Sequence, residues 1–147
     1  KPGSANGYGL LGGTANAIQA KKRPLSSMTP TIVFDGTGKP IIATGSPGGS
    51  TIITIILQMI LNTSDFNMGI AEATAAPRFH HQWLPDMIFR ESGFSKDTIR
   101  LLESMGHKVS SKTRVLGSTQ SISVKGNFLE ASADNRRDGA AAVPPNQ

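Results

Sequence analysis

The sequence predicts a mixed α/β (α+β) domain in which helices pack on a sheet. Residues 31–34 and 40–45 are apolar segments joined by a turn with two glycines, a pattern typical of a β-hairpin. Residues 96–105 carry apolar side chains at helical spacing between Ser95, a cap residue, and Gly106, a stop signal. Strand-like segments precede, separate and follow the helical ones. This order favours a layered domain over a helix bundle or a β-sandwich.

The chain divides into three parts by composition. Residues 1–30 are rich in Gly, Pro, Ser and Asn and show no periodicity, so we expect an extended loop segment. The sheet-and-helix core is expected over residues 31–139, followed by a frayed tail over residues 140–147. Both strands of the first hairpin are apolar at successive positions, as expected of a sheet covered on two faces.

The remaining elements follow from capping and periodicity. The segment "TIITIILQMILN", residues 51–62, predicts a helix capped by Ser50 and buried on nearly all sides. A shorter helix is expected over residues 69–76, because Pro77 ends it. Further strands are predicted at 87–91, 107–111, 119–124 and 128–132, the last two as a hairpin.

A glycine corner, Ser46-Pro47-Gly48-Gly49, stands between the second strand and the apolar helix. The first amides of a helix have no partner within the helix, and glycines let another molecule approach the backbone closely. The partial positive charge there favours an anion, which could be a phosphate, a carboxylate or the oxyanion of acyl transfer. The alternative is a tight turn needed only for chain reversal.

Other motifs carry weaker signals. "GYGLLG", residues 7–12, matches a dinucleotide-binding pattern but neither follows a predicted strand nor opens a helix, so we expect a loop. "PLSSMTP", residues 24–30, presents Ser26 and Ser27 between prolines, which suits hydrogen bonding to a carboxylate, although a serine-rich loop is the simpler interpretation. His80 and His81 are adjacent and face opposite sides of an extended segment, so we expect a structural pair and no metal site.

The composition limits which classes of binding partner we expect. The 147 residues carry a net charge of +5, concentrated at residues 21–23 and 136–137, with six Phe, one Trp and one Tyr. A solvated surface is a better interpretation than nucleic-acid binding, because no basic stripe with stacking residues is present. Cysteine is absent, and the longest apolar run, residues 52–61, is too short to cross a bilayer, so we expect a soluble domain without membrane insertion.

Four motifs, "KRPLSSMTPTIV", "ATGSPGGSTIITIILQMILN", "APRFHHQWLPD" and "GSTQSI", together resemble the small subunit of γ-glutamyltransferase (γ-glutamyltranspeptidase). The resemblance spans nearly all of residues 1–147. It implies a four-layer αββα sandwich of the N-terminal-nucleophile (Ntn) hydrolase class, incomplete in this chain. It also implies a precursor (zymogen) that cuts itself into a large and a small subunit, which form a heterodimer. An N-terminal Thr then transfers the γ-glutamyl group of glutathione to water or to an amino acid or peptide. No metal or organic cofactor is implied.

The resemblance assigns roles residue by residue. Ser26 and Ser27 resemble the pair that binds the α-carboxylate of the γ-glutamyl group, and Gly48 and Gly49 resemble the oxyanion-hole donors. The nucleophilic Thr should lie several dozen residues before Lys1, so this chain by itself should be catalytically inactive.

Two positions depart from the family pattern, Thr51 where "GGSRI" is common and Asn135 where "DPR" is usual. The first could alter acceptor preference, and the second is expected to affect only a turn. A related acylase, a γ-polyglutamate transpeptidase and a non-catalytic binding or assembly fragment remain open. Family habit suggests a periplasmic or secreted location.

Overall fold

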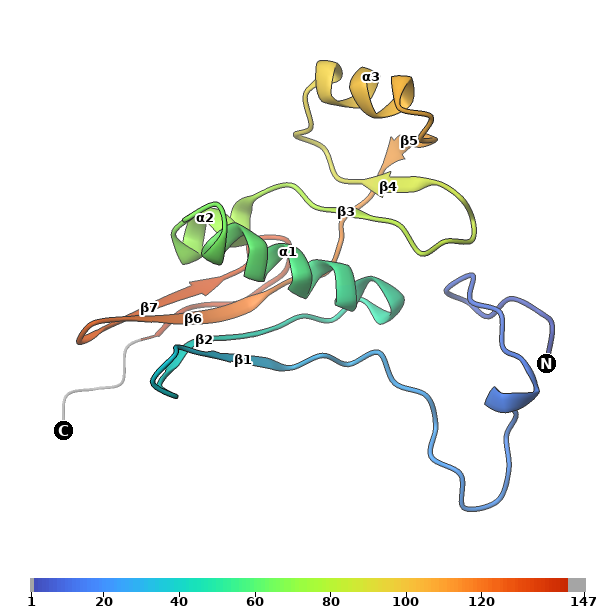
Figure 1. Cartoon of the computed structure of the whole chain (residues 1–147), viewed down its shortest axis with the longest axis horizontal. Helices are drawn as coiled ribbons and strands as arrows, with labels where there is room; N and C mark the ends of the chain where they lie inside the picture. Colours follow the sequence, from blue (N-terminus) through green and yellow to red (C-terminus); the bar gives the residue numbers. More distant parts are fainter. Residues whose placement is uncertain (1, 143–147) are drawn as a thin grey trace.

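The computed structural model describes residues 2–142, so the last five residues of the expected tail lie outside the described residues. Residues 2–30 run along one side of the molecule without a regular strand, apart from a short 3₁₀ turn (Figure 1). The strands are β1 (Thr31–Phe34), β2 (Pro40–Gly45), β3 (Phe79–His80), β4 (Ile88–Arg90), β5 (Val109–Thr113), β6 (Gln120–Lys125) and β7 (Phe128–Ala133). The helices are η1 (Thr14–Asn16), η2 (Gly49–Thr51), α1 (Ile52–Ser64), α2 (Ile70–Ala75) and α3 (Lys96–Ser104).

The main sheet is antiparallel, with the strand order β1-β2-β6-β7. Both predicted hairpins are present, β1 with β2 and β6 with β7, and each predicted strand lies within two residues of its expected bounds. The pairing of β2 with β6 joins Thr44 to Ser121 through a hydroxyl hydrogen bond of 2.7 Å. Because both residues are buried, this bond fixes the register between the two hairpins.

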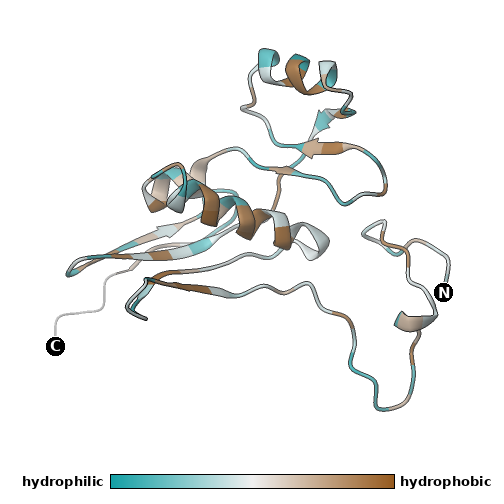
Figure 2. Ribbon diagram, in the orientation of Figure 1, coloured by the Kyte–Doolittle hydropathy of each residue, from teal (hydrophilic) through white to brown (hydrophobic). Residues whose placement is uncertain are grey.

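The helices α1 and α2 pack on one face of this sheet (Figure 1). Met59, Ile70 and Ala73 form the centre of the contact, with Ile42 of β2 packed against them. The expectation that the apolar helix is buried on nearly all sides was wrong, because Ile53 is 58% exposed and every fourth residue after it lies on the same open side. The brown bands along α1 in Figure 2 mark its apolar residues, and Ile53 and Leu57 among them are more than half exposed.

The opposite face of the main sheet is open, which also corrects the expectation of cover on both faces. Ile32, Ala43, Ile122 and Ala131 are register partners across four strands and line a shallow apolar hollow of about 650 Å³. Ile32 is 59% exposed and Ile122 46%. The described residues thus supply one helix layer and one sheet layer, which is half of a four-layer αββα sandwich.

A smaller unit stands beside the main sheet. Strands β3, β4 and β5 form a three-stranded sheet, in which β4 and β5 run parallel and are connected by α3. Ser95 caps α3 as predicted, since its Oγ accepts the amide of Thr98 at 3.0 Å, and Gly106 follows the helix with a φ of 92°.

A buried ionic network joins the two units. Arg78, just before β3, donates to Asp134 Oδ2 at 2.7 Å, and Arg136 donates to Glu91 Oε2 at 2.6 Å. Burial raises the pKa of Asp134, but the amides of Arg136 and Thr119 and the Arg78 guanidinium outweigh it and lower the pKa to about 2. The sequence context of Arg136 suggested that it belongs to a solvated basic patch. This expectation was wrong, because its side chain is only 11% exposed.

Candidate active site

The glycine corner connects the end of β2 to the start of α1. Gly48 has a φ of 147° and Gly49 a φ of 58°, both in the region that favours glycine. The corner then tightens into the turn η2, where the amide and the hydroxyl of Thr51 both donate to the carbonyl of Gly48, at 3.2 and 2.9 Å. Ser50 lies inside this turn, so the prediction that it caps the apolar helix was wrong. Its hydroxyl instead donates to Gln82 Oε1 at 3.0 Å.

The amides of this corner are available to a ligand. Within residues 2–142, neither the amide of Gly48 nor that of Gly49 has an acceptor among the protein's own groups. Both precede a helix of thirteen residues, whose dipole favours negative charge at this end. The arrangement can therefore hold a carboxylate, a phosphate or the oxyanion of a tetrahedral intermediate.

The segment before β6 holds the corner from the other side. Ser46 donates its hydroxyl to Pro47 O at 2.8 Å and accepts the amide of Ser118 at 3.0 Å. Gly117 has a φ of 69°, and a Cβ there would lie 2.4 Å from Ser46 Oγ and 2.9 Å from Pro47 O. Only glycine allows this close approach, so the "GSTQSI" motif buttresses the corner.

The structure brings one of the two predicted serines to the corner. Ser27 donates its hydroxyl to the carbonyl of Gly49 at 2.8 Å, which ties the "PLSSMTP" segment to the glycine pair. Ser26 is exposed, and its Oγ accepts the amide of Met28 at 3.1 Å. The O–H of Ser26 has no acceptor among residues 2–142 and is free to donate outward.

A cleft of about 440 Å³ opens beside Gly48 and Ser50. Tyr8 forms part of its wall and also lies against Gly49, since a Cβ on Gly49 would be 2.4 Å from Tyr8 Cε1. The cations in its lining are Arg114, whose guanidinium lies 3.9 Å above the ring of Phe89, and Arg137. No carboxylate is among its lining residues in the described chain, and neither predicted serine lines it.

The two histidines separate as their spacing predicted. His80 is buried and joins a hydrogen-bond network with Thr54 and Gln82, whereas His81 faces Asp86 at 3.3 Å. No group of three or more candidate metal ligands is present among residues 2–142. None of the helices in this part of the chain has the length and apolar character needed to cross a membrane.

Two site residues were missed by the sequence interpretation. Tyr8 lies in the "GYGLLG" loop, which opens no helix and is closed by a bridge between Ala5 and Leu11. Gln82 lies in the irregular stretch after β3 and contacts Tyr8 from 74 residues away. No local pattern indicates either role, because each depends on a contact between segments distant in sequence.

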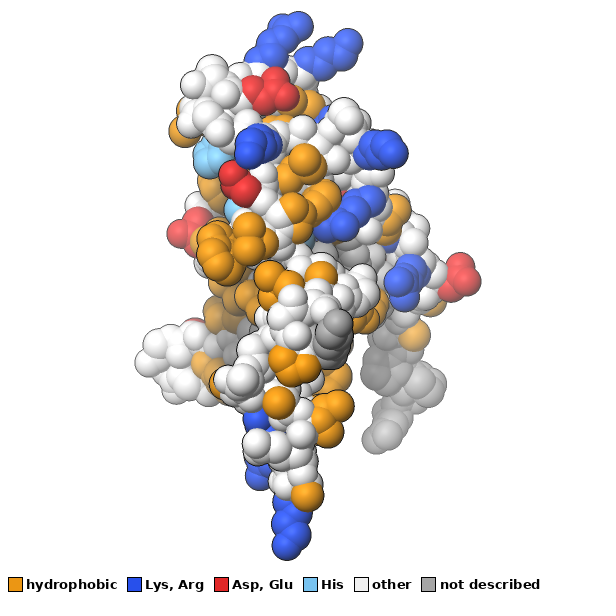
Figure 3. Space-filling view, turned by 90° about the vertical axis from the view of Figure 1, so that its right-hand side faces the viewer, with side chains coloured by type: hydrophobic (Ala, Val, Ile, Leu, Met, Phe, Trp, Pro, Cys, Tyr) orange, Lys and Arg blue, Asp and Glu red, His pale blue; other side chains and the backbone are white. Residues whose placement is uncertain are grey.

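Figure 3 shows how side chains are distributed on the face that carries the N-terminal segment. Hydrophobic side chains are spread over the upper half and the middle of this face, and Lys and Arg side chains lie among them in the upper half and again at the lower end. The basic residues 21–23 are not among the lining residues of the cleft beside the glycine corner.

A helix layer on an antiparallel sheet is half of the four-layer αββα fold of the Ntn hydrolases. Solved structures of that class superpose on nearly the whole chain. An acivicin-inhibited γ-glutamyltranspeptidase matches with a TM-score of 0.89 and 48% identity, over 95% of this chain and 76% of that one. The enzyme of Pseudomonas nitroreducens complexed with L-DON matches with a TM-score of 0.89 and 39% identity, over 99% and 76%.

Sequence comparison gives the family. The γ-glutamyltranspeptidase family model matches residues 1–144, and the chain belongs to that family, as the resemblance implied. A glutathione hydrolase proenzyme of Escherichia coli strain K12 is 60% identical over 124 residues, which are 84% of this chain and 21% of that protein. The chain thus spans about a fifth of the length of this curated relative.

Proposed function

We propose that this chain is the C-terminal portion of the small subunit of an enzyme that transfers γ-glutamyl groups. The donor is glutathione or a related γ-glutamyl amide, and the acceptor is water, an amino acid or a peptide. Support comes from the curated relative, a glutathione hydrolase proenzyme at 60% identity. The observation that carries the proposal is the pair of unpaired amides at Gly48 and Gly49, in front of a helix N-terminus.

In this reaction the chain supplies the groups that receive charge. When a nucleophile attacks the γ-carbonyl carbon, the carbonyl oxygen becomes an oxyanion, to which the amides of Gly48 and Gly49 donate. One such preorganised donor is worth about 3–4 kcal/mol in the transition state. Ser26 and Ser27 donate to the α-carboxylate of the γ-glutamyl group, for which the Ser27 hydroxyl turns away from Gly49 O. The nucleophile is a Thr outside residues 1–147, and a γ-glutamyl-enzyme intermediate carries the group to the acceptor.

The large subunit of the same precursor is the proposed partner. The open apolar face around Ile32 and Ile122 suits a second sheet layer, because it buries apolar area that this chain leaves exposed. We further propose that self-cleavage of a precursor produces the two subunits, and the word proenzyme in the relative's name supports the existence of such a precursor. A periplasmic or secreted location belongs to the same proposal, and cell fractionation tests it.

The alternatives from the sequence rank below this proposal. An acylase or a γ-polyglutamate transpeptidase would use the same corner with another donor, but the name of the curated relative, a glutathione hydrolase proenzyme, favours glutathione. A non-catalytic fragment would not need glycines with unpaired amides.

The test is an assay of the processed two-subunit protein with a chromogenic γ-glutamyl anilide. The double variant Ser26→Ala/Ser27→Ala should lose affinity for this donor, but lose little for the α-methyl ester of the same donor, which lacks the carboxylate. Equal losses for both donors would contradict the carboxylate role. Absence of anilide turnover in the unaltered protein would contradict the proposed function itself.

A further inference from the structure

The N-terminal segment is held against the rest of the protein by few polar contacts. Among residues 2–142, the segment 2–25 makes a single hydrogen bond outside itself, from Gln82 Nε2 to the carbonyl of Tyr8 at 3.0 Å. Its other hydrogen bonds are internal, such as the amide of Asn6 to Leu10 O at 2.9 Å. The bridge between residues 5 and 11 makes this part a small closed loop with Tyr8 near its tip.

Gln82 uses every hydrogen-bonding position of its carboxamide. Nε2 donates to Tyr8 O and to Leu84 O at 3.0 and 3.1 Å, while Oε1 accepts from Ser50 Oγ at 3.0 Å and from His80 Nε2 at 2.9 Å. Both partners of Nε2 are carbonyls, which only accept. The carboxamide therefore has one orientation that satisfies all four partners.

His80 fixes that orientation from behind. Its Nε2 lies 2.9 Å from Gln82 Oε1 and donates to it, because a carboxamide oxygen only accepts. Its Nδ1 lies 2.8 Å from the hydroxyl oxygen of Thr54, which holds the imidazole ring in place from the other side. Burial lowers the pKa of His80, the hydrogen bond with Gln82 raises it by less, and the charges of Arg114 and His81 lower it further. A rotated carboxamide would present its NH₂ group to the N–H of His80.

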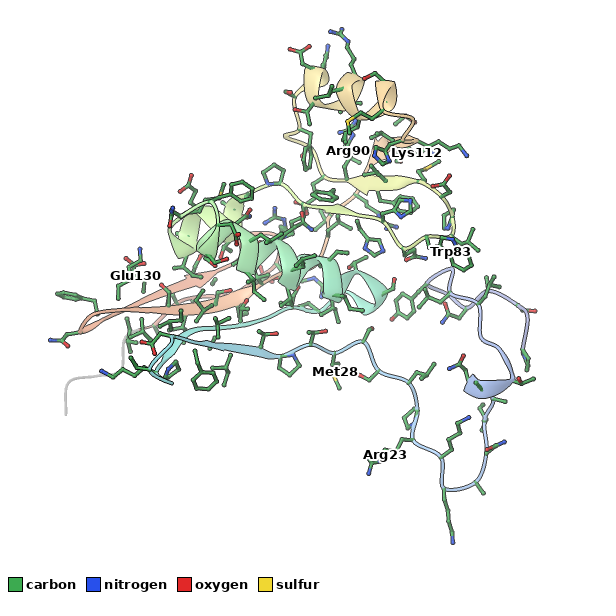
Figure 4. All side chains as sticks on the ribbon, viewed as in Figure 1. Arg23, Met28, Trp83, Arg90, Lys112 and Glu130 are labelled. Atoms are coloured by element: carbon green, nitrogen blue, oxygen red, sulfur yellow. The ribbon has the colours of Figure 1, made fainter. Side chains whose placement is uncertain are left out.

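The loop that Gln82 holds lies on the glycine corner. The Tyr8 ring packs against Gly49. A Cβ built on Gly9 would lie 3.4 Å from Gln82 Nε2, so the backbone of Gly9 is also close to this side chain. Tyr8 is nevertheless 62% exposed, so apolar burial contributes little to keeping it in place. Figure 4 labels Trp83, the neighbour of Gln82, where the stretch after β3 meets the N-terminal loop.

We propose that Gln82 is a positioning residue whose carboxamide latches residues 5–11 over Gly49 and thereby sets the affinity for the γ-glutamyl donor. The latch itself depends only on the contacts above, whereas its effect on donor affinity rests on the proposed function. Gln82 does not touch the reacting atoms. It acts through Tyr8, which closes the side of the corner where the donor carbonyl must lie.

The test compares Gln82→Glu with the unaltered protein in its processed two-subunit form. Glutamate has the same shape and still accepts from Ser50 and His80, but its carboxylate has no proton to donate to Tyr8 O or Leu84 O. Chymotrypsin should then cleave after Tyr8 about tenfold faster under native conditions, because the loop opens more often. For a γ-glutamyl anilide, we expect KM to rise about tenfold while kcat stays within about twofold.

Two controls separate the latch from a general structural effect. His81→Gln changes the neighbouring exposed side chain, which contacts Asp86 and the amide of Trp83 and not Tyr8, so it should leave cleavage and KM unchanged. Gln82→Met keeps an unbranched side chain without donors or charge. It should reproduce the Gln82→Glu phenotype and serves as the test if the glutamate variant does not fold.

Each outcome bears on a defined part of the proposal. Unchanged cleavage after Tyr8 in both Gln82 variants would overturn the latch. Faster cleavage with unchanged KM would overturn its role in donor affinity, and a loss confined to kcat would do the same. If the unaltered protein turned over no γ-glutamyl donor, the proposed function would fail while the cleavage result still decided the latch.

Discussion

Replacing Asp134 by Asn should destabilise the protein strongly. The carboxylate is fully buried and accepts five hydrogen bonds. Oδ2 accepts from Arg78 at 2.7 Å and from the amide and hydroxyl of Thr119 at 2.8 and 3.2 Å, and Oδ1 from the amide and Nη1 of Arg136 at 3.0 and 3.1 Å. Asparagine retains one oxygen, turns its NH₂ group toward donors at the other position, and leaves two arginines with one carboxylate fewer. Breaking a buried ion pair in this way costs about 3–5 kcal/mol.

The assay is thermal unfolding of the processed two-subunit protein. With an unfolding entropy of about 2.1 cal/mol/K per residue and a protein about four to five times as long as this chain, each kcal/mol shifts Tm by about 1 °C, so Tm should fall by about 3–5 °C. Asp138→Asn is the matched control, since it removes the same charge from an exposed position in the same loop and should change stability by less than about 0.5 kcal/mol. Equal Tm values for the two variants would refute the reasoning that the buried network stabilises the fold.

Three further predictions follow from the same structure. Because the pKa of Asp134 is lowered from 3.8 to about 2, its contribution to the free energy of unfolding is complete above about pH 5 and is lost as the pH falls toward 2. The unaltered and Asp134→Asn proteins should therefore converge in stability at acid pH. A difference in stability that stays constant with pH would contradict this. Gly48→Ala should lower turnover of a γ-glutamyl anilide by about 10²-fold or more, because at a φ of 147° the added Cβ would lie 2.6 Å from Thr51 Oγ1 and displace the corner. Gly45→Ala is the control, since its Cβ would have nothing within 4 Å, and it should leave turnover unchanged. Similar rates for the two variants would count against the role of the corner. The isolated chain should bind a hydrophobic dye and aggregate, because the apolar face of its main sheet is exposed. Ile122→Lys places a charge on this face and should slow aggregation. A monodisperse chain that binds no dye would contradict an open apolar face.

Local patterns in the sequence were enough to predict every element except the two-residue strand β3 and the 3₁₀ turns. Ser95 and Gly106 bound α3 because capping depends on residues within one or two turns. The hairpins were predictable for the same reason, since turn chemistry and strand composition lie close together in the chain. The mixed fold class and the membership in the γ-glutamyltranspeptidase family, which depends on four motifs in order, are confirmed.

Apart from the cap at Ser50, the predictions that failed concern how elements are buried. The composition of α1 indicated a helix surrounded by protein, and the apolar strands indicated a sheet covered twice, but residues 2–142 cover only one side of each. A sequence records how apolar a surface is. It does not record whether the covering layer belongs to the same chain.

The sequence by itself determined the glycine corner, the paired serines and the strands and helices that carry them, because each is written in neighbouring residues. Only the tertiary structure decided which amides stay unpaired, that Ser27 reaches Gly49, and that Gln82 holds Tyr8 across 74 residues. The physical reason is range. Backbone conformation and capping are set within a few residues, whereas hydrogen bonds between distant segments exist only once packing has brought those segments together.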